Sequence, residues 1–201
     1  MRAWGFLCSC ARCESPSELG SHYSSVKCLQ CSPGHCQPLN TCVLGSDWSC
    51  DTCGHVIGQE HVTSILARCK AIVVRAGDSV DKCEDHLEQL QQHLHPNHGY
   101  CVQLKTNLIS SYDRIRDKTR DQLQRQLELV QDVVAVMDII DPGQTPKRGG
   151  LLKTVLDIKM KIANKDVEEG VIDKKQHLLA MKSNMMLMKE VMKCLRYSVV
   201  M

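Results

Sequence analysis

The spacing of the cysteines near the start of the chain is the strongest constraint on what it can fold into. The chain has 13 cysteines in 201 residues, and nine of them lie within the first 53. Two pairs have CxxC spacing, Cys28 with Cys31 and Cys50 with Cys53, and 18 residues separate the two pairs. Two thiolates three positions apart on a turn can bind one tetrahedral ion, so two such turns close the shell of a structural zinc site. The sequence therefore predicts a zinc-stabilised N-terminal segment.

A second cysteine group, Cys8, Cys10 and Cys13, precedes these pairs. Its CxCxxC pattern supplies three soft ligands and needs a fourth from elsewhere for a tetrahedral shell. Either the group stays without a metal or one of five nearby side chains completes it. These candidates are Cys36, Cys42, His22, His35 and His55.

Disulfide bonds are the alternative explanation for so many cysteines. The odd count, the CxxC spacing and the lack of a secretory signal pattern favour metal-bound thiolates in a reducing compartment. We therefore predict an intracellular protein, in the cytoplasm or the nucleus. No apolar run approaches the roughly 18 residues of a membrane span, so no membrane partner is expected.

The charge of the cysteine-rich segment bears on its partners. The whole chain has a net charge of +2, and residues 1–58 hold three basic against four acidic side chains. A zinc ribbon that binds DNA or RNA needs a basic patch to neutralise phosphates. We therefore expect no direct contact with nucleic acid.

From about residue 59 the apolar residues recur with helical spacing, and aromatic residues make up only 3% of the chain. We predict a mainly α fold with five or six antiparallel helices, stacked as a bundle or a tetratricopeptide-like array. Helix-breaking turns are expected at His95-Pro96-Asn97 and Asp141-Pro142-Gly143, and a capping box at Asp173 to Gln176. His95 and His98 are expected in helix-terminal or solvated positions. The predicted helices are 59–76, 80–94, 99–116, 123–140, 150–165 and a last one from about 173.

Two further sets of residues are predicted to face the helical core. Four isolated cysteines at helical positions are expected as small apolar core residues: Cys69, Cys83, Cys101 and Cys194. A stripe on the last helix has strict helical spacing, and it consists of Leu178, Met181, Met185, Met188, Met192 and Leu195. We expect the stripe in the core; a peptide-binding groove is the alternative, because methionine adapts to many partners.

Six short motifs follow one another in an order that resembles a known family. They are Phe6-x-Cys8-x-Cys10-x-x-Cys13, Glu18-Leu19-Gly20, Trp48-x-Cys50-x-x-Cys53, Leu94-His95-Pro96-Asn97-His98, Ile140-Asp141-Pro142-Gly143 and Arg148-Gly149-Gly150-Leu151-Leu152. Together they resemble the C-terminal half of the SET-and-MYND-domain (SMYD) protein-lysine methyltransferases, in particular arthropod-type members. The resemblance is specific in the cysteine blocks and looser in the helices.

This resemblance implies roles for the first motif. In that family the CxCxxC cluster is the post-SET segment, which binds one zinc ion with a fourth cysteine from the SET core. Cys8, Cys10 and Cys13 match the three ligands, and Phe6 matches an aromatic residue that helps to enclose the adenine of S-adenosylmethionine. Trp4 departs from the family, which often has a tyrosine of the lysine channel at that place.

The resemblance also implies a division of the chain. Residues 1–20 correspond to the post-SET segment, residues 21–58 form a zinc-ribbon-like segment, and residues 59–201 form the helical domain. The sequence has no MYND finger, no glycine-rich cofactor loop and no Gly-Glu-Glu-Ile segment of a SET core. We therefore expect the chain to be inactive on its own, with S-adenosylmethionine bound only in a complete family member.

The sequence is compatible with two functions. The chain is either part of a protein-lysine methyltransferase, acting on a histone or another protein, or a non-catalytic zinc-stabilised module that binds protein partners. An Asn-His-x-Cys motif upstream in the gene would favour the first. In both cases zinc is the expected cofactor and a protein is the expected partner.

Overall fold

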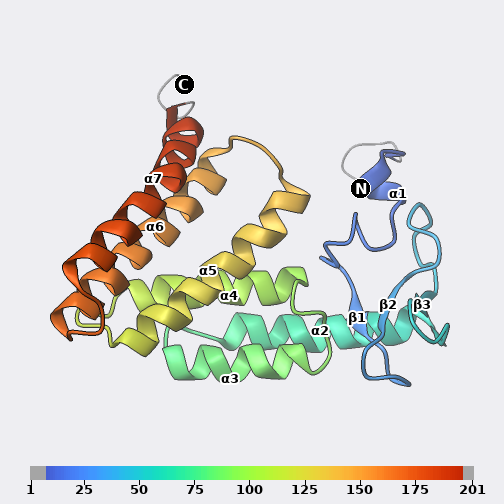
Figure 1. Ribbon diagram of the computed structural model, residues 1–201. Coiled ribbons are helices and arrows are strands. Elements are labelled where there is room, and N and C mark those ends of the chain that lie inside the picture. The colour runs from blue at the N-terminus through green and yellow to red at the C-terminus, as the bar shows by residue number, and fades with distance from the viewer. Residues whose placement is uncertain (1–7, 197–201) are drawn as a thin grey trace. The chain divides into compact units, whose positions relative to one another are not determined.

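The computed structural model describes residues 8–196 and confirms a mainly α protein with a small, cysteine-rich sheet near its N-terminus (Figure 1). The chain forms two compact units that divide between Leu104 and Lys105, within one helix. None of the helices in the described part of the chain is both long and apolar enough to cross a membrane.

Four short strands form an antiparallel meander in the order β1-β2-β3-β4. In register, Val26 lies opposite Cys36, and Cys36 lies opposite Cys50. These three side chains are buried and form the centre of the sheet. The strands are β1 (Val26–Lys27), β2 (His35–Pro38), β3 (Trp48–Cys50) and β4 (Val56–Ile57), and a short helix that was not predicted, α1 (Ala11–Glu14), precedes them.

The helices of the first unit follow the sheet directly. They are α2 (Gln59–Arg75), α3 (Val80–Gln91) and the start of α4 (Gly99–Asp113). The indole N–H of Trp48 donates to the Gln59 side chain at 2.8 Å, which links β3 to the first turn of α2. Cys69, Cys83 and Cys101 are buried, as their helical positions predicted.

The loop between α3 and α4 is joined to the sheet by backbone hydrogen bonds. The N–H of Lys27 donates to the carbonyl of His93 at 2.8 Å, and the N–H of His95 donates to the carbonyl of Ser25 at 3.1 Å. The first turn of α4 then meets the preceding loop, where the N–H of Gly99 donates to the carbonyl of Tyr23 at 2.8 Å. The Leu94–His98 motif therefore joins the cysteine-rich segment to the helices.

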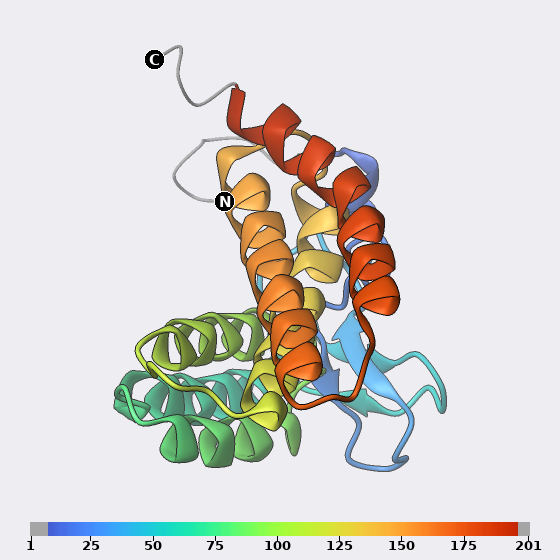
Figure 2. The same cartoon turned by 60° about the vertical axis from the view of Figure 1, so that its left-hand side comes forward.

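The second unit contains the rest of α4 and three longer helices, in which α6 packs against both α5 and α7 (Figure 2). They are α5 (Arg120–Ile140), α6 (Pro146–Glu168) and α7 (Lys174–Arg196). As predicted, α5 buries apolar side chains on two faces, among them Leu127, Leu129 and Val133, but the helix that packs against both of its neighbours is α6.

Side chains cap the three long helices of the second unit. Thr119 and Gln122 form a capping box at α5, and the predicted capping box at α7 is present, since Asp173 and Gln176 each accept from the other's backbone N–H. Thr145 caps α6, with Pro146 at its first position, so this helix begins four residues earlier than predicted. Together with α2–α4, these helices correspond to the six that the apolar spacing predicted.

The predicted core stripe of α7 is wrong. Of its six members, Leu178, Met185, Met188 and Met192 are exposed, and Met181 and Leu195 are half-buried. The face that packs inwards instead carries Asn184, Val191 and Cys194. The helix has apolar residues on nearly every side, so spacing alone does not identify the buried one.

Candidate metal centre

Four cysteines from two turns of the sheet meet at one point. Cys28 and Cys31 lie in the turn between β1 and β2, Cys50 ends β3, and Cys53 lies in the turn before β4. Their sulfur atoms all lie within 4.8 Å of one another. The sulfur atoms of Cys28 and Cys53 are 3.7 Å apart, and those of Cys31 and Cys50 are 3.6 Å apart. The structure thus brings together the set that the CxxC spacing predicted.

Backbone N–H groups point at these sulfur atoms. The N–H of Gln30 lies 3.3 Å from the Cys28 sulfur, and those of Thr52 and Cys53 lie 3.4 and 3.5 Å from the Cys50 sulfur. Such donors orient the ligands and stabilise negative charge on sulfur. The turns are therefore arranged for thiolates.

The thiols of this group differ in their pKa values. Burial acts to raise the pKa of Cys28, but the N–H groups of Gln30 and Cys31 and the neighbouring thiols outweigh it and lower that pKa to about 6. Burial, followed by the thiols of Cys53 and Cys50, raises the pKa of Cys31 to about 12. The group therefore carries negative charge near neutral pH, and a bound cation would displace the remaining protons.

Gly34 leaves space that the sulfur atoms need. A Cβ atom at this position would lie 2.5 Å from the Cys31 sulfur and closer still to the Cys50 sulfur. The carbonyl of Gly34 also accepts from the N–H of Cys28 at 2.9 Å, which closes the turn. Four thiolates around a glycine cradle fit one tetrahedral ion, and an all-sulfur set suggests zinc. A closed shell of four protein ligands has no open position, so the chemistry of such a site is structural.

Cys8, Cys10 and Cys13 form a second group whose sulfur atoms also lie within 4.8 Å of one another. Cys10 precedes α1, and the helix turn carries Cys13 back towards it. The N–H of Cys13 and the thiol of Cys8 lower the pKa of Cys10 to about 7, while hydrogen bonds from Cys8 and Cys10 raise the pKa of Cys13 to about 11. Among residues 8–196, no His, Cys, Asp or Glu joins these three as a fourth ligand.

The five candidate fourth ligands therefore do not complete this group within the described residues. Cys36 is buried in the middle of β2, and His35 packs with other histidines. Phe6, which the resemblance places beside a cofactor adenine, lies outside the described residues.

A cavity of about 430 Å³ lies beside the second cysteine group, and Cys10 and Cys13 contribute to its wall. Glu18 lines it as well, where its carboxylate accepts from Arg12 at 3.1 Å and from the Ser24 hydroxyl at 2.5 Å. Glu18 and Leu19 both have positive φ, of 52° and 62°, in the tight turn of the Glu18-Leu19-Gly20 motif. The N–H groups of Leu19 and Gly20 donate to the hydroxyls of Ser15 and Ser17, both at 3.0 Å, and these hydrogen bonds hold the turn in its strained conformation.

The structure contains a cluster of three histidines that the sequence did not predict. The ring of His95 stacks on His22 and meets His35 edge-on, with both centroid distances 4.5 Å. These residues come from the loop before β1, from β2 and from the loop between α3 and α4, so no local pattern indicates them. His98 lies directly before α4, so it has the helix-terminal position expected for it, and it is buried. Its Nδ1 accepts from the N–H of Tyr100 at 3.1 Å, and burial lowers its pKa to about 4.

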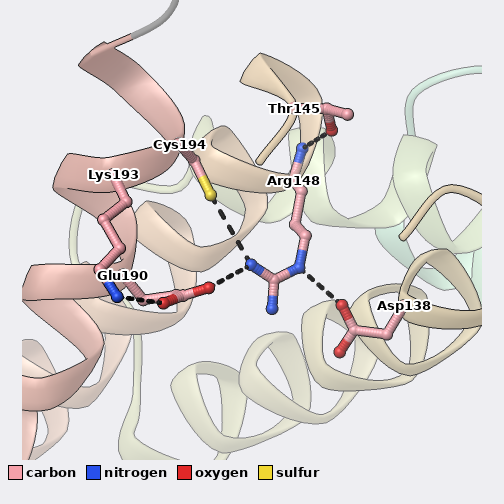
Figure 3. Close-up of polar contacts among 6 residues, drawn as sticks. All are labelled: Asp138, Thr145, Arg148, Glu190, Lys193 and Cys194. Atoms are coloured by element: carbon pink, nitrogen blue, oxygen red, sulfur yellow. Dashed lines mark hydrogen bonds and ion pairs between the residues drawn. The ribbon is translucent and has the colours of Figure 1, made fainter. Parts of the chain in front are cut away.

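In the second unit, the motif that begins with Arg148 anchors α7 (Figure 3). The guanidinium donates to Asp138 of α5 at 2.7 Å and to Glu190 of α7 at 2.9 Å. It also lies 3.6 Å from the Cys194 sulfur. A Cβ on Gly149 would lie only 2.7 Å from the Cys194 Cβ, so a glycine is needed for α7 to approach this closely. The motif is thus a packing device.

Comparison with known proteins gives a partial match. No protein-family model matches the chain. It is 40% identical over 52 residues to the SET domain-containing protein SmydA-8, isoform B, of Drosophila melanogaster. The aligned stretch covers 25% of this chain and 12% of that relative, so the chain spans a small part of its length. The match supports a relationship to SET-domain proteins of the Smyd type.

Proposed function

We propose that this chain is a zinc-stabilised C-terminal portion of a SET-and-MYND-type protein-lysine methyltransferase. In this proposal the segment 8–20 forms part of the wall of a cofactor and substrate site, and the helices from residue 59 onwards, in a tetratricopeptide-like arrangement, restrict access to it. The 201 residues alone are expected not to transfer methyl groups. Support comes from the likeness to the SET domain-containing Drosophila protein and from the order of the motifs.

The observation that carries this proposal is the incomplete thiol group beside the cavity. Cys8, Cys10 and Cys13 offer three sulfur ligands, two of which also line the cavity of about 430 Å³. A tetrahedral zinc ion needs a fourth ligand. In this proposal the fourth ligand comes from a SET core. The metal then joins that core to the segment with Cys8, Cys10 and Cys13, and the cavity lies where the core and the segment meet. The chain's own role would then be to place the wall of the site, while S-adenosylmethionine supplies the methyl group when bound.

Cobalt(II) titration of the purified chain tests this proposal, because the sulfur-to-metal charge-transfer band grows with the number of thiolates bound. We expect one equivalent to bind at Cys28, Cys31, Cys50 and Cys53 with a four-thiolate spectrum. A second equivalent should reach a four-thiolate spectrum only after addition of a peptide that contains Asn-His-Ala-Cys. The Cys10→Ser variant should lose the response to the peptide, whereas Cys50→Ser should lose the first equivalent and keep that response.

A non-catalytic protein-interaction module is the alternative, and the exposed apolar side chains of α7 favour it. If two equivalents of cobalt(II) give four-thiolate spectra without added peptide, the second group completes its own shell. The chain would then have no need of a SET core, and the alternative would replace the proposal.

A further inference from the structure

The outward face of α7 has three rows of side chains, each with a seven-residue repeat. The central row is basic, and apolar rows lie on either side of it. The basic row is Lys175, Lys182, Lys189 and Arg196; one apolar row is Leu178, Met185 and Met192, and the other is Leu179 and Met186. On a helix, residues three and four positions apart are neighbours, so Lys182 and Lys189 lie between the two apolar rows, and Lys175 and Arg196 continue the basic row at its two ends.

The apolar rows are far more exposed than such side chains usually are. Met186 is 80% exposed, and the remaining four lie between 49% and 58%. The opposite face of the same helix is closed, with Val191 at 3% and Cys194 at 0%. The helix therefore has one face packed in the protein and a second, separate apolar surface that faces solvent. Apolar surfaces of this kind, bounded by charge, commonly mark sites of association.

The charge of α7 is strongly one-sided. The helix carries six basic residues and a single acidic one, Glu190. Glu190 already pairs with Arg148 at 2.9 Å and lies 3.8 Å from Lys193. The four side chains of the basic row form no ion pair with any residue between 8 and 196. The row thus presents uncompensated positive charge between two apolar rows.

We propose that this face of α7 binds an acidic amphipathic helix of a partner protein. The partner would carry carboxylates along one heptad row, opposite the basic row, and leucine-like side chains on either side, packed against the two apolar rows. A repeat of seven suits such pairing, because it keeps two helices in register as they wind around each other. The inference stands apart from the metal sites and from the proposed methyltransferase relationship.

Charge and geometry favour this occupant over two others. A second copy of α7 would place one basic row against another, which is repulsive. The apolar rows could insert into a membrane, but Lys182 and Lys189 lie between these rows. Their charged groups would then be buried deepest in the bilayer. Interfacial helices instead keep their basic residues on the polar face. A row of carboxylates on a partner helix would instead form ion pairs with the lysines in their observed positions.

A designed three-heptad peptide tests this proposal. It carries glutamate at one heptad position and leucine at the two flanking ones; a scrambled peptide of the same composition serves as control. We expect the patterned peptide to bind the chain in fluorescence anisotropy, to slow amide exchange in α7 and to bind more weakly as salt is raised. The double substitution K182E/K189E should weaken binding at least about tenfold. The matched double variant K70E/K82E changes exposed lysines of α2 and α3 by the same charge and should leave binding unchanged.

Several outcomes would overturn the proposal. One is equal binding of patterned and scrambled peptides, and another is equal binding by the two double variants. A third is binding to vesicles of phosphatidylcholine and phosphatidylserine that needs Lys182 and Lys189 while the peptide does not bind. A dimer that K182E/K189E dissociates in sedimentation would show that a second copy is the occupant. The variant Met185→Gln, at an exposed site that should not affect folding, must weaken peptide binding as well.

Discussion

The cysteine-rich segment and the helices α5–α7 reach a stable fold by different means. The strands of the segment are two to four residues long, and in its middle the buried residues opposite one another include two cysteines, Cys36 and Cys50. Short strands without a large apolar face are marginal in water. Helix α5 instead buries leucine and valine side chains along most of its length. The four thiols of the segment could hold a metal ion, and we expect a bound metal to supply there the stability that apolar packing supplies in α5–α7.

Metal removal should give the largest difference in stability between the two regions. A bound structural zinc contributes on the order of 10–16 kcal/mol of apparent binding free energy, which a small sheet cannot replace. We expect a chelator, or Cys50→Ser, to abolish amide protection in residues 26–57 and to leave it intact in α5–α7. Hydrogen exchange with mass spectrometry measures both at once.

Cys42→Ser is the matched control for metal removal, because Cys42 lies outside both thiol groups. It should retain protection in both regions. Loss of protection in α5–α7 together with the sheet would contradict the comparison, and so would a sheet that stays protected without metal.

Gly34→Ala should have the next largest effect. The added Cβ would fall within 2.5 Å of the Cys31 sulfur, and two ligands would have to move. Changes just outside a metal's ligands typically cost about 10- to 100-fold in affinity, and we expect a loss of at least this size in a competition titration with a chromophoric chelator. Gly58→Ala is the control, since its Cβ would meet nothing closer than 3.9 Å. Equal affinities for the two variants would mean that Gly34 does not shape the site.

His98 gives the first unit a sensitivity to acid that does not depend on metal. Burial lowers its pKa from 6.5 to about 4, so above pH 6.5 the residue is neutral in both the folded and the unfolded chain. As the pH falls from 6.5 to 4, the unfolded chain binds a proton that the folded chain does not. The free energy of unfolding should therefore decrease over this window, by about 3 kcal/mol in total.

His98→Asn tests this, because an amide oxygen can still accept the N–H of Tyr100 but does not titrate. Urea unfolding at several pH values should show a smaller loss of stability for the variant between pH 6.5 and 4. Wild type and variant lose metal alike in acid, so the difference between them isolates His98. Parallel curves for the two proteins would refute the assignment.

The sequence predicted those features that depend on neighbours along the chain. The CxxC pairs indicated four sulfur ligands because each turn places two thiols by itself, and only the joining of two turns had to be inferred. Helix ends were predictable where a cap lies in the local sequence, as at Asp173 and Gln176. The same holds for the mainly helical fold class, which follows from apolar spacing.

Features that depend on distant segments could not be predicted in this way. His22, His35 and His95 meet because three separate loops and strands converge, and nothing in their local sequence distinguishes them. The burial of α7 is a similar case. Its methionines have helical spacing, yet the contacts that fix its orientation come from Arg148 and Gly149 on α6. Spacing identifies an apolar face, but a partner's shape decides which face is covered.

A pair of glycine substitutions tests that last point, with the smallest expected effect. In Gly149→Ala the added Cβ would lie 2.7 Å from the Cys194 Cβ and 3.2 Å from Leu195, so α7 would have to shift. Overpacking of this kind costs about 1–3 kcal/mol, against a gain of about 1 kcal/mol from replacing a helical glycine. Gly150→Ala gains the same helix propensity with nothing within 4 Å of its Cβ. We therefore expect thermal unfolding to show Gly149→Ala destabilised and Gly150→Ala stabilised. If both variants are stabilised, α7 does not approach α6 this closely, and the choice of its buried face must have another cause.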